Sequence, residues 1–208
     1  MRGVARLTPV EIETYGFDAA MPEIALVGNT GSSYWEDFSR SPEFSDGGSD
    51  PLDRWSRRIG DAIAEAFALR ALYPFEGPPY FPFQQWAGRA EDLQQSPVGV
   101  MMHPEFGLWH SYRFALQGAE LMALAQPVSS DSPCLSCADK PCLHTCPVDA
   151  FDADGYAYQR CADYLHATPQ ADCHSRGCLA RHACPVAPGY RYVDAQGAFH
   201  LRAFLDHH

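Results

Sequence analysis

The chain has 208 residues with a formal net charge of -11, and 46% of its residues are hydrophobic and 20% charged. This length suits one or two domains with a hydrophobic core, and the composition is ordinary for a globular protein. No apolar run reaches the roughly 18 residues of a membrane span, and the N-terminus is too polar for a secretory signal. We therefore expect a cytoplasmic protein without a membrane partner. The acidic balance and the lack of a basic segment predict no nucleic-acid partner, and they suit docking of an electron-donor protein.

Strands and other elements are mixed in the first part of the chain. Residues 23–28 (EIALVG) predict a buried strand, and residues 98–102 (VGVMM) and 112–116 (YRFAL) predict two more. Residues 29–50 hold many Gly, Ser and Asp, so they predict mainly loop. Together with the helix described next, these segments indicate an α+β fold.

A helix is predicted to begin at Asp50-Pro51, because an Asx cap followed by proline is typical of a helix start. Its length is about 18 residues, judged from the helical spacing of apolar side chains. That spacing predicts one buried face, made of Trp55, Ile59, Ile63, Ala66 and Phe67.

The cysteines divide the chain. All eight lie in the last part, and residues 1–125 contain none. The segment 127–133 (PVSSDSP) between the two parts is typical of a linker or turn cluster. We therefore predict one domain over residues 1–126 and a second over residues 127–208.

Two sets of cysteines each end in a Cys-Pro pair. The first set has the spacing C-x2-C-x4-C-x3-C-P, and the bacterial ferredoxin pattern is C-x2-C-x2-C-x3-C-P. The middle gap is therefore two residues longer here. The members of the first set are Cys134, Cys137, Cys142 and Cys146, and those of the second are Cys161, Cys173, Cys178 and Cys184. Cysteines in a cytoplasmic chain are more often metal ligands or catalytic thiols than disulfides.

In the ferredoxin pattern, the cysteine before proline ligates the other cluster. Applied here, this crossing predicts two [4Fe–4S] clusters that use all eight cysteines. One cluster takes Cys134, Cys137, Cys142 and Cys184, and the other takes Cys146, Cys161, Cys173 and Cys178. Structural zinc and disulfides are the alternatives, although two zinc sites would not call for paired Cys-Pro endings. Such clusters move single electrons, so the last part of the chain is predicted to be an electron carrier.

The stretch HPEFGLWHSYR, residues 103–113, resembles a motif of the CblC (MMACHC) cobalamin-processing chaperones, HP-x-FGGW-x-x-x-R, with Leu108 in place of the second glycine. An aromatic-Gln segment upstream, residues 80–84, is similar to that family as well. The resemblance implies cobalamin contacts from Tyr80, Phe81, Gln84, His103, Phe106, Gly107, Trp109 and Arg113. The alternative is a strand–turn–strand connection whose aromatic side chains only pack.

The cysteine-rich half resembles the ferredoxin module of epoxyqueuosine reductases and reductive dehalogenases. Arg160-Cys161-Ala-Asp-Tyr-Leu165 is similar to an RC-x-x-YL segment found there. Those proteins join a nitroreductase-like cobalamin domain to two [4Fe–4S] clusters. The resemblance therefore implies a nitroreductase-like, corrinoid-binding domain followed by a ferredoxin-like domain.

These resemblances together predict an oxidoreductase that reduces bound cobalamin or reductively removes its upper ligand. No catalytic residue can be assigned from the sequence. Two alternatives stay open: a two-cluster ferredoxin that serves a protein partner, and a reductase that binds FMN, as nitroreductase-like folds often do.

Overall fold

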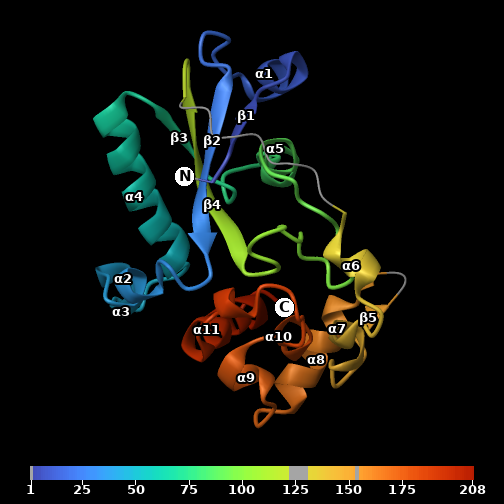
Figure 1. Cartoon of the computed structure of the whole chain (residues 1–208). Coiled ribbons are helices and arrows are strands. Elements are labelled where there is room, and N and C mark those ends of the chain that lie inside the picture. Colours follow the sequence, from blue (N-terminus) through green and yellow to red (C-terminus); the bar gives the residue numbers. More distant parts are fainter. Residues whose placement is uncertain (1, 122–130, 153–154) are drawn as a thin grey trace. The chain divides into compact units, whose positions relative to one another are not determined.

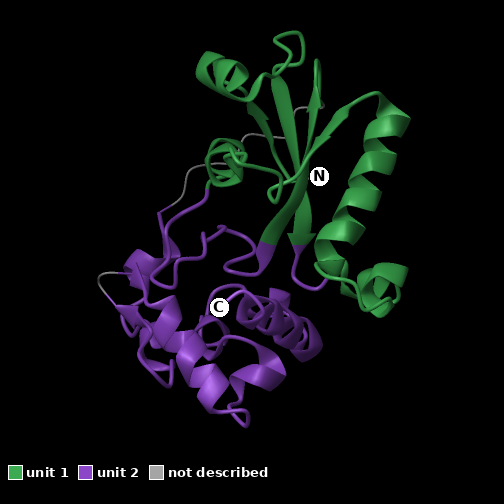
Figure 2. Ribbon diagram, turned by 180° about the vertical axis from the view of Figure 1, so that it is seen from behind, with its two compact units in different colours: residues 1–29, 33–92, 111–129 green, residues 30–32, 93–110, 130–208 purple. Residues whose placement is uncertain are grey.

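The computed structural model describes residues 2–121, 131–152 and 155–208. The chain forms two compact units (Figure 2). Unit 1 comprises residues 1–29, 33–92 and 111–129, and unit 2 comprises residues 30–32, 93–110 and 130–208. Residues 93–110, which the sequence placed with the first domain, therefore belong to the cysteine-rich unit. No helix among the described residues is both long and apolar enough to cross a membrane.

Unit 1 is built on a sheet with the strand order β1-β2-β4-β3 (Figure 1). Its strands are β1 (Val4–Arg6), β2 (Glu23–Thr30), β3 (Arg70–Leu72) and β4 (His110–Gly118). β1 pairs antiparallel with β2, and β3 pairs antiparallel with β4. The strands predicted at residues 23–28 and 112–116 are confirmed. Gly28 allows the close approach of β2 and β4, because a Cβ there would lie 1.9 Å from the carbonyl oxygen of Ser111.

Helices cover both sides of this sheet (Figure 1). The long helix α4 (Pro51–Phe67) runs along one side, and α1 (Pro9–Tyr15) and α5 (Phe83–Ala90) lie on the other. A capping box between Thr8 and Glu11 begins α1. The buried Glu11 carboxylate also accepts hydrogen bonds from Trp86 Nε1 at 3.0 Å and Arg89 Nη2 at 2.9 Å, which ties α1 to α5.

The predicted helix at residues 51–67 is confirmed, but its predicted face is partly wrong. Phe67 is 71% exposed, whereas Gly60 is buried. The reason is a close contact in the middle of the helix, where a Cβ on Gly60 would lie 2.5 Å from Tyr73 Oη. The Tyr73 hydroxyl donates to the Arg57 carbonyl. The buried residues of the helix are Leu52, Ser56, Gly60 and Ala64.

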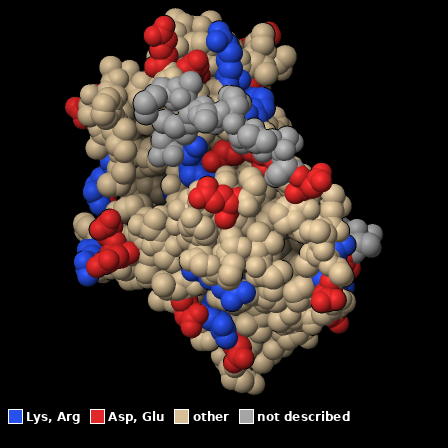
Figure 3. All heavy atoms as spheres, in the orientation of Figure 1, with Lys and Arg blue, Asp and Glu red and all other residues tan. Residues whose placement is uncertain are grey.

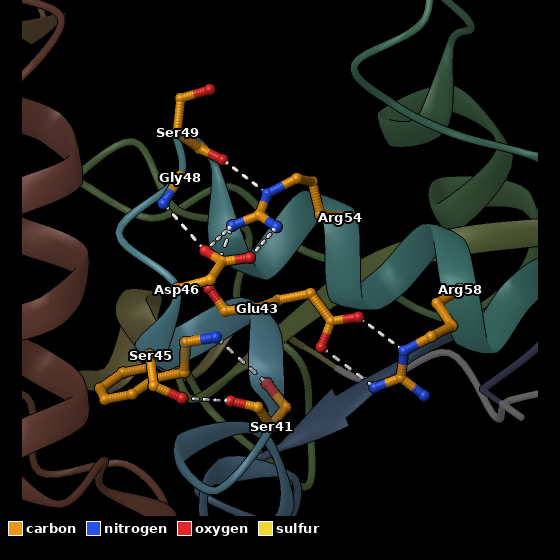
Figure 4. A network of polar contacts seen from close by, with 9 residues as sticks. Ser41, Glu43, Ser45, Asp46, Gly48, Ser49, Arg54 and Arg58 are labelled. Carbon is orange, nitrogen blue, oxygen red and sulfur yellow. Dashed lines mark hydrogen bonds and ion pairs between the residues drawn. The ribbon is translucent and has the colours of Figure 1, made fainter.

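The loop predicted for residues 29–50 is also partly wrong, because two short helices lie there: α2 (Trp35–Ser39) and α3 (Pro42–Ser45). Ser41 caps α3 by accepting a hydrogen bond from the Phe44 amide. Two arginines of α4 then hold α3 in place, as Figure 4 shows. Arg54 binds Asp46 through two hydrogen bonds of 2.7 Å, and Arg58 binds Glu43 through bonds of 2.5 and 3.1 Å.

Unit 2 is mostly short helices joined by turns. They are α6 (Pro133–Ser136), α7 (Pro141–His144), α8 (Tyr158–Ala167), α9 (Cys173–Arg176), α10 (Leu179–His182), the 3-10 helix η1 (Pro188–Tyr190) and α11 (Asp194–Leu205), with a small hairpin of β5 (Phe151–Asp152) and β6 (Gly155–Tyr156). α9 and α11 touch through glycines, since a Cβ on Gly197 would lie 2.2 Å from the Arg176 carbonyl oxygen.

The strand predicted at residues 98–102 is wrong. Met102 forms only an isolated bridge with Gln94, and Gly99 adopts a φ of +76° inside a turn. The apolar side chains of this stretch are buried for another reason. Val98 and Met102 pack with Leu108 in a core cluster that also contains Cys142 and Cys184. This packing explains why residues 93–110 belong to unit 2.

Candidate functional site

Four cysteines from distant parts of the sequence surround one cavity in unit 2. Cys134 lies on α6, Cys142 on α7, and Cys184 follows α10, and together with Cys137 they line about 350 Å³ of empty space. The remaining wall is largely apolar and includes Val98, Met102, Leu108, Pro185 and Val186. The cavity therefore contains the first of the two cysteine groups that the crossing pattern predicts.

The other four cysteines surround a second cavity of about 450 Å³ in the same unit. Cys161 lies on α8, Cys173 begins α9, and Cys178 precedes α10, while Cys146 follows α7. The apolar wall is made of Val148, Phe151, Leu165, Leu179, Ala180, Leu201 and Phe204. The Cys146 Sγ accepts a hydrogen bond from the Ala150 amide at 3.3 Å. This is the second predicted group.

The thiols that raise a cysteine's pKa belong to the same set of four as that cysteine. Burial raises the pKa of Cys142, and the neighbouring thiols of Cys184, Cys134 and Cys137 raise it further. Burial likewise raises the pKa of Cys173, and its thiol neighbours are Cys161 and Cys146. Each site thus favours neutral thiols unless a cationic group is bound, because an apolar wall penalises a cluster of thiolates.

The cysteines are free thiols, and none of the eight is in a disulfide. Within the described ranges, no group of three or more Cys, His, Asp or Glu side chains is placed to hold a single metal ion. Each set of four cysteines therefore surrounds a space instead of converging on one point.

The stretch at residues 103–110 packs within unit 2. His103 and Gly107 exchange backbone hydrogen bonds, and His103 Nδ1 accepts from the amides of Glu105 at 3.0 Å and Phe106 at 3.2 Å. The His103 ring also stacks on Phe106, with centroids 4.4 Å apart. Gly107 has a φ of +59°, and a Cβ there would lie 2.9 Å from the Val186 carbonyl oxygen. His103 therefore shapes a tight turn.

Trp109 is fully enclosed, with 1% of its surface exposed. Its ring meets His182 and Tyr192 edge-on, at centroid distances of 5.1 and 5.4 Å. The Arg181 guanidinium carbon lies 4.9 Å from the Trp109 ring centroid, and Arg181 Nη2 donates to the Leu108 carbonyl. Trp109 is thus a packing residue of unit 2.

The remaining residues for which a cobalamin contact is predicted lie in unit 1. Tyr80 is 62% exposed and Gln84 is exposed, while Phe81 packs on Phe17 and Trp86 at centroid distances of 5.6 and 5.9 Å. Arg113 forms an ion pair with Asp53. The predicted contacts are therefore divided between the units: His103, Phe106, Gly107 and Trp109 lie in unit 2, and Tyr80, Phe81, Gln84 and Arg113 lie in unit 1.

A third cavity in unit 2, of about 460 Å³, brings together residues that the sequence did not single out. Arg176, Arg181, His182, Tyr192 and His200 line it, together with Trp109. These side chains come from α9, α10, α11 and two loop positions and form no motif, so no signal in the sequence could have identified this group.

Comparison with known proteins gives a fold but no family. No family model matches the chain, and no match was found among curated proteins. Among solved structures, the chain is similar to epoxyqueuosine reductase from Bacillus subtilis, with a TM-score of 0.51 and 17% identity, covering 91% of this chain and 62% of that one. The chain thus spans less than two thirds of that structure. The fold is α+β and epoxyqueuosine-reductase-like.

Two further structures give lower scores. An epoxyqueuosine reductase with an epoxyqueuosine-modified tRNA-Tyr stem loop has a TM-score of 0.46 at 14% identity, covering 92% of this chain and 62% of that one. A selenomethionine-labelled epoxyqueuosine reductase has a TM-score of 0.46 at 13% identity, covering 94% and 64%. The Bacillus subtilis match agrees with the fold that the resemblance to epoxyqueuosine reductases predicts. The resemblance to CblC finds no support in these structures.

The predicted exclusion of a nucleic-acid partner is corrected, because one of these similar structures holds a tRNA stem loop. The exclusion rested on the net charge of -11, which is a sum over the whole chain. Figure 3 shows basic side chains interspersed with acidic ones over the face in view, so the sum describes no single surface. Binding to a polyanion depends on local charge.

Proposed function

We propose that this chain is an iron–sulfur reductase in which two [4Fe–4S] clusters pass single electrons. The observation that supports it most is the arrangement of the cysteines. Each of the two cavities is lined by four of them, in the grouping that a crossed two-cluster pattern requires. The nitroreductase-like and ferredoxin-like descriptions of the two parts belong to the same proposal.

The donor set fits iron–sulfur clusters better than zinc. A zinc ion holds its thiolates at about 2.3 Å, so four ligands must converge on one point. Within the described residues no such convergence is found, and the cysteines of each set instead line a cavity of their own. Thiolates around a space of this kind match a group that carries several metal ions.

The chain's own residues would bind the clusters, exclude water and adjust the charge on sulfur. When bound, the clusters supply reversible one-electron transfer. The apolar walls, with Met102 and Leu108 at one site and Phe151 and Leu165 at the other, keep water away. The Ala150 amide donates to Cys146 Sγ, which stabilises negative charge there.

A corrinoid as the electron acceptor rests on the sequence resemblance and stays a prediction. The side chains of His103, Phe106 and Trp109 are engaged within unit 2, and Trp109 is 1% exposed. His103 and Trp109 are buried, so they present little surface to a macrocycle. FMN is the alternative acceptor.

Anaerobic reconstitution tests the proposal. We expect about 8 iron and 8 sulfide per chain, because each cubane holds four of each. Stoichiometric zinc without the broad visible absorbance of clusters would overturn it. The reduced protein, freed of excess dithionite, is then mixed with cob(II)alamin or with FMN. Cluster oxidation by only one of them identifies the acceptor class, and oxidation by neither leaves a protein partner as the acceptor.

A further inference from the structure

The third cavity of unit 2 is lined by positive and aromatic side chains and by no acidic residue. Together with the open solvent at its mouth, it holds about 460 Å³ of space not occupied by protein atoms. Arg176 and Arg181 come from α9 and α10, and Tyr192 and Trp109 contribute aromatic surface. Leu201 and Phe204 of α11 complete an apolar wall. The two cysteine cavities also lack carboxylates, but only this third cavity is lined by arginine side chains.

The two arginines have no carboxylate partner among the residues that the structure describes. Other arginines do: Arg54 pairs with Asp46, and Arg89 pairs with Glu11. Arg176 is exposed and makes no ion pair within the same described ranges. Arg181 Nη2 donates to a backbone carbonyl, which leaves its charge without a neutralising group.

Two buried donors beside the cavity also have no hydrogen-bond partner within the described part of the chain. They are Arg181 Nε and Trp109 Nε1. The guanidinium packs against two neighbouring rings, with its carbon 4.9 Å from the Trp109 centroid and 4.5 Å from the Tyr192 centroid. Leaving buried donors unpaired is unfavourable, and a fixed guanidinium needs little rearrangement to meet a ligand.

We propose that this cavity binds the phosphate group of a small aromatic phosphate, with a nucleoside monophosphate as the representative ligand. Guanidinium groups match the oxygens of phosphate in geometry and charge. The neighbouring apolar wall of Leu201 and Phe204 provides a surface for the ring of the same ligand. Inorganic phosphate shares the recognised group but lacks the ring, and RNA carries phosphodiesters instead. The site goes beyond the proposed function, and it shares Cys178, Leu201 and Phe204 with the second cysteine cavity.

Isothermal titration calorimetry under anaerobic conditions tests the proposal on the full reconstituted chain. AMP should bind saturably with one site per chain and more tightly than inorganic phosphate. Arg176→Gln should weaken AMP binding roughly 3- to 10-fold, because an exposed charge contributes modestly. Arg181→Lys should weaken it roughly tenfold or more, because an ammonium cannot reproduce the planar fork. The matched control is Arg202→Gln, which removes the same charge from an exposed position of α11 outside the cavity.

Iron content is measured first for every variant, so that failure of the cluster proposal is distinguishable from failure of this one. Protein with full iron that does not bind AMP or inorganic phosphate would overturn the phosphate site. Equal losses in Arg202→Gln and Arg176→Gln would also overturn it, since binding would then follow net charge alone. Binding of a short RNA with hydroxyl ends but not of AMP would reject the small-ligand assignment.

Discussion

Cys178 and Cys184 are close neighbours in the sequence, yet they line different cavities. The short helix α10 (Leu179–His182) lies between them and carries the chain from one cavity to the other. Cys184 therefore joins Cys142, which is far away in the sequence, while Cys178 joins Cys173 on the preceding helix α9.

Exchanging either cysteine for serine should remove a different cluster. We expect Cys184→Ser and Cys178→Ser each to lose about half of the iron, because each variant leaves one complete set of four thiolates. EPR spectra of the two reduced variants should therefore differ. Cys161→Ser should match Cys178→Ser, since both residues line the second cavity. If Cys161→Ser keeps its full iron content, the grouping of the ligands is wrong.

The grouping of the cysteines could be predicted because it follows from local chemistry. A proline after Cys146 and after Cys184 turns the chain away from the preceding cysteines, and spacing alone then suggests the exchange. The cavities contain the groups so predicted, while the role of the thiols as ligands stays a prediction.

The conformation of residues 98–102 and the unit to which they belong could not be predicted in the same way. An apolar run such as VGVMM fits a buried strand and a loop packed on another unit equally well. Only the tertiary contacts of Val98 and Met102 with the cysteine-rich core decide between them. Likewise, Arg181 meets Trp109 through folding, across a large separation in the chain.

The ion pair of Glu43 with Arg58 should make stability depend on pH in the acid range. The hydrogen bonds from Arg58 lower the pKa of Glu43 from 4.5 to about 2. A lowered folded-state pKa means that the stabilisation is fully present above pH 4.5 and is lost as the pH falls towards 2. The free energy of unfolding of wild type minus that of Glu43→Gln should therefore shrink across this window.

Urea unfolding at a series of pH values measures this difference in the free energy of unfolding. The effect of any other titrating group is common to both proteins and cancels in the difference. Glu36→Gln is the control, because the Glu36–Arg40 pair has 74% exposed side chains and should contribute little at any pH. A difference for Glu43→Gln that stays constant down to pH 2 would contradict the role of this ion pair.

Truncation of Trp109 should destabilise unit 2. The side chain is 1% exposed and packs against His182, Tyr192 and Arg181. Trp109→Ala should therefore cost about 3–5 kcal/mol, the usual range for a buried aromatic side chain. Phe67→Ala is the control, because Phe67 is 71% exposed and should change stability by less than about 0.5 kcal/mol. Equal unfolding midpoints in the two variants would show that Trp109 is not a packing residue.

His103 offers a way to separate a structural role from a role at a bound acceptor. Its Nδ1 accepts from the amides of Glu105 and Phe106, so His103→Ala leaves both donors without this acceptor. The expected cost is about 1–3 kcal/mol if water does not replace it. An asparagine can accept from the amide two residues later through its side-chain oxygen. His103→Asn should therefore regain much of the stability, as measured by anaerobic urea unfolding at full iron content.

The rate of cluster oxidation by cob(II)alamin or FMN gives the second readout for the same variants. If His103 only shapes the turn, His103→Asn should restore the rate together with stability. If the imidazole acts on the acceptor, stability should return while the rate stays low, because asparagine supplies an acceptor oxygen but no titratable ring. Stability that falls equally in His103→Asn and His103→Ala would contradict the hydrogen bonds of Nδ1 as the reason that histidine stands at this turn.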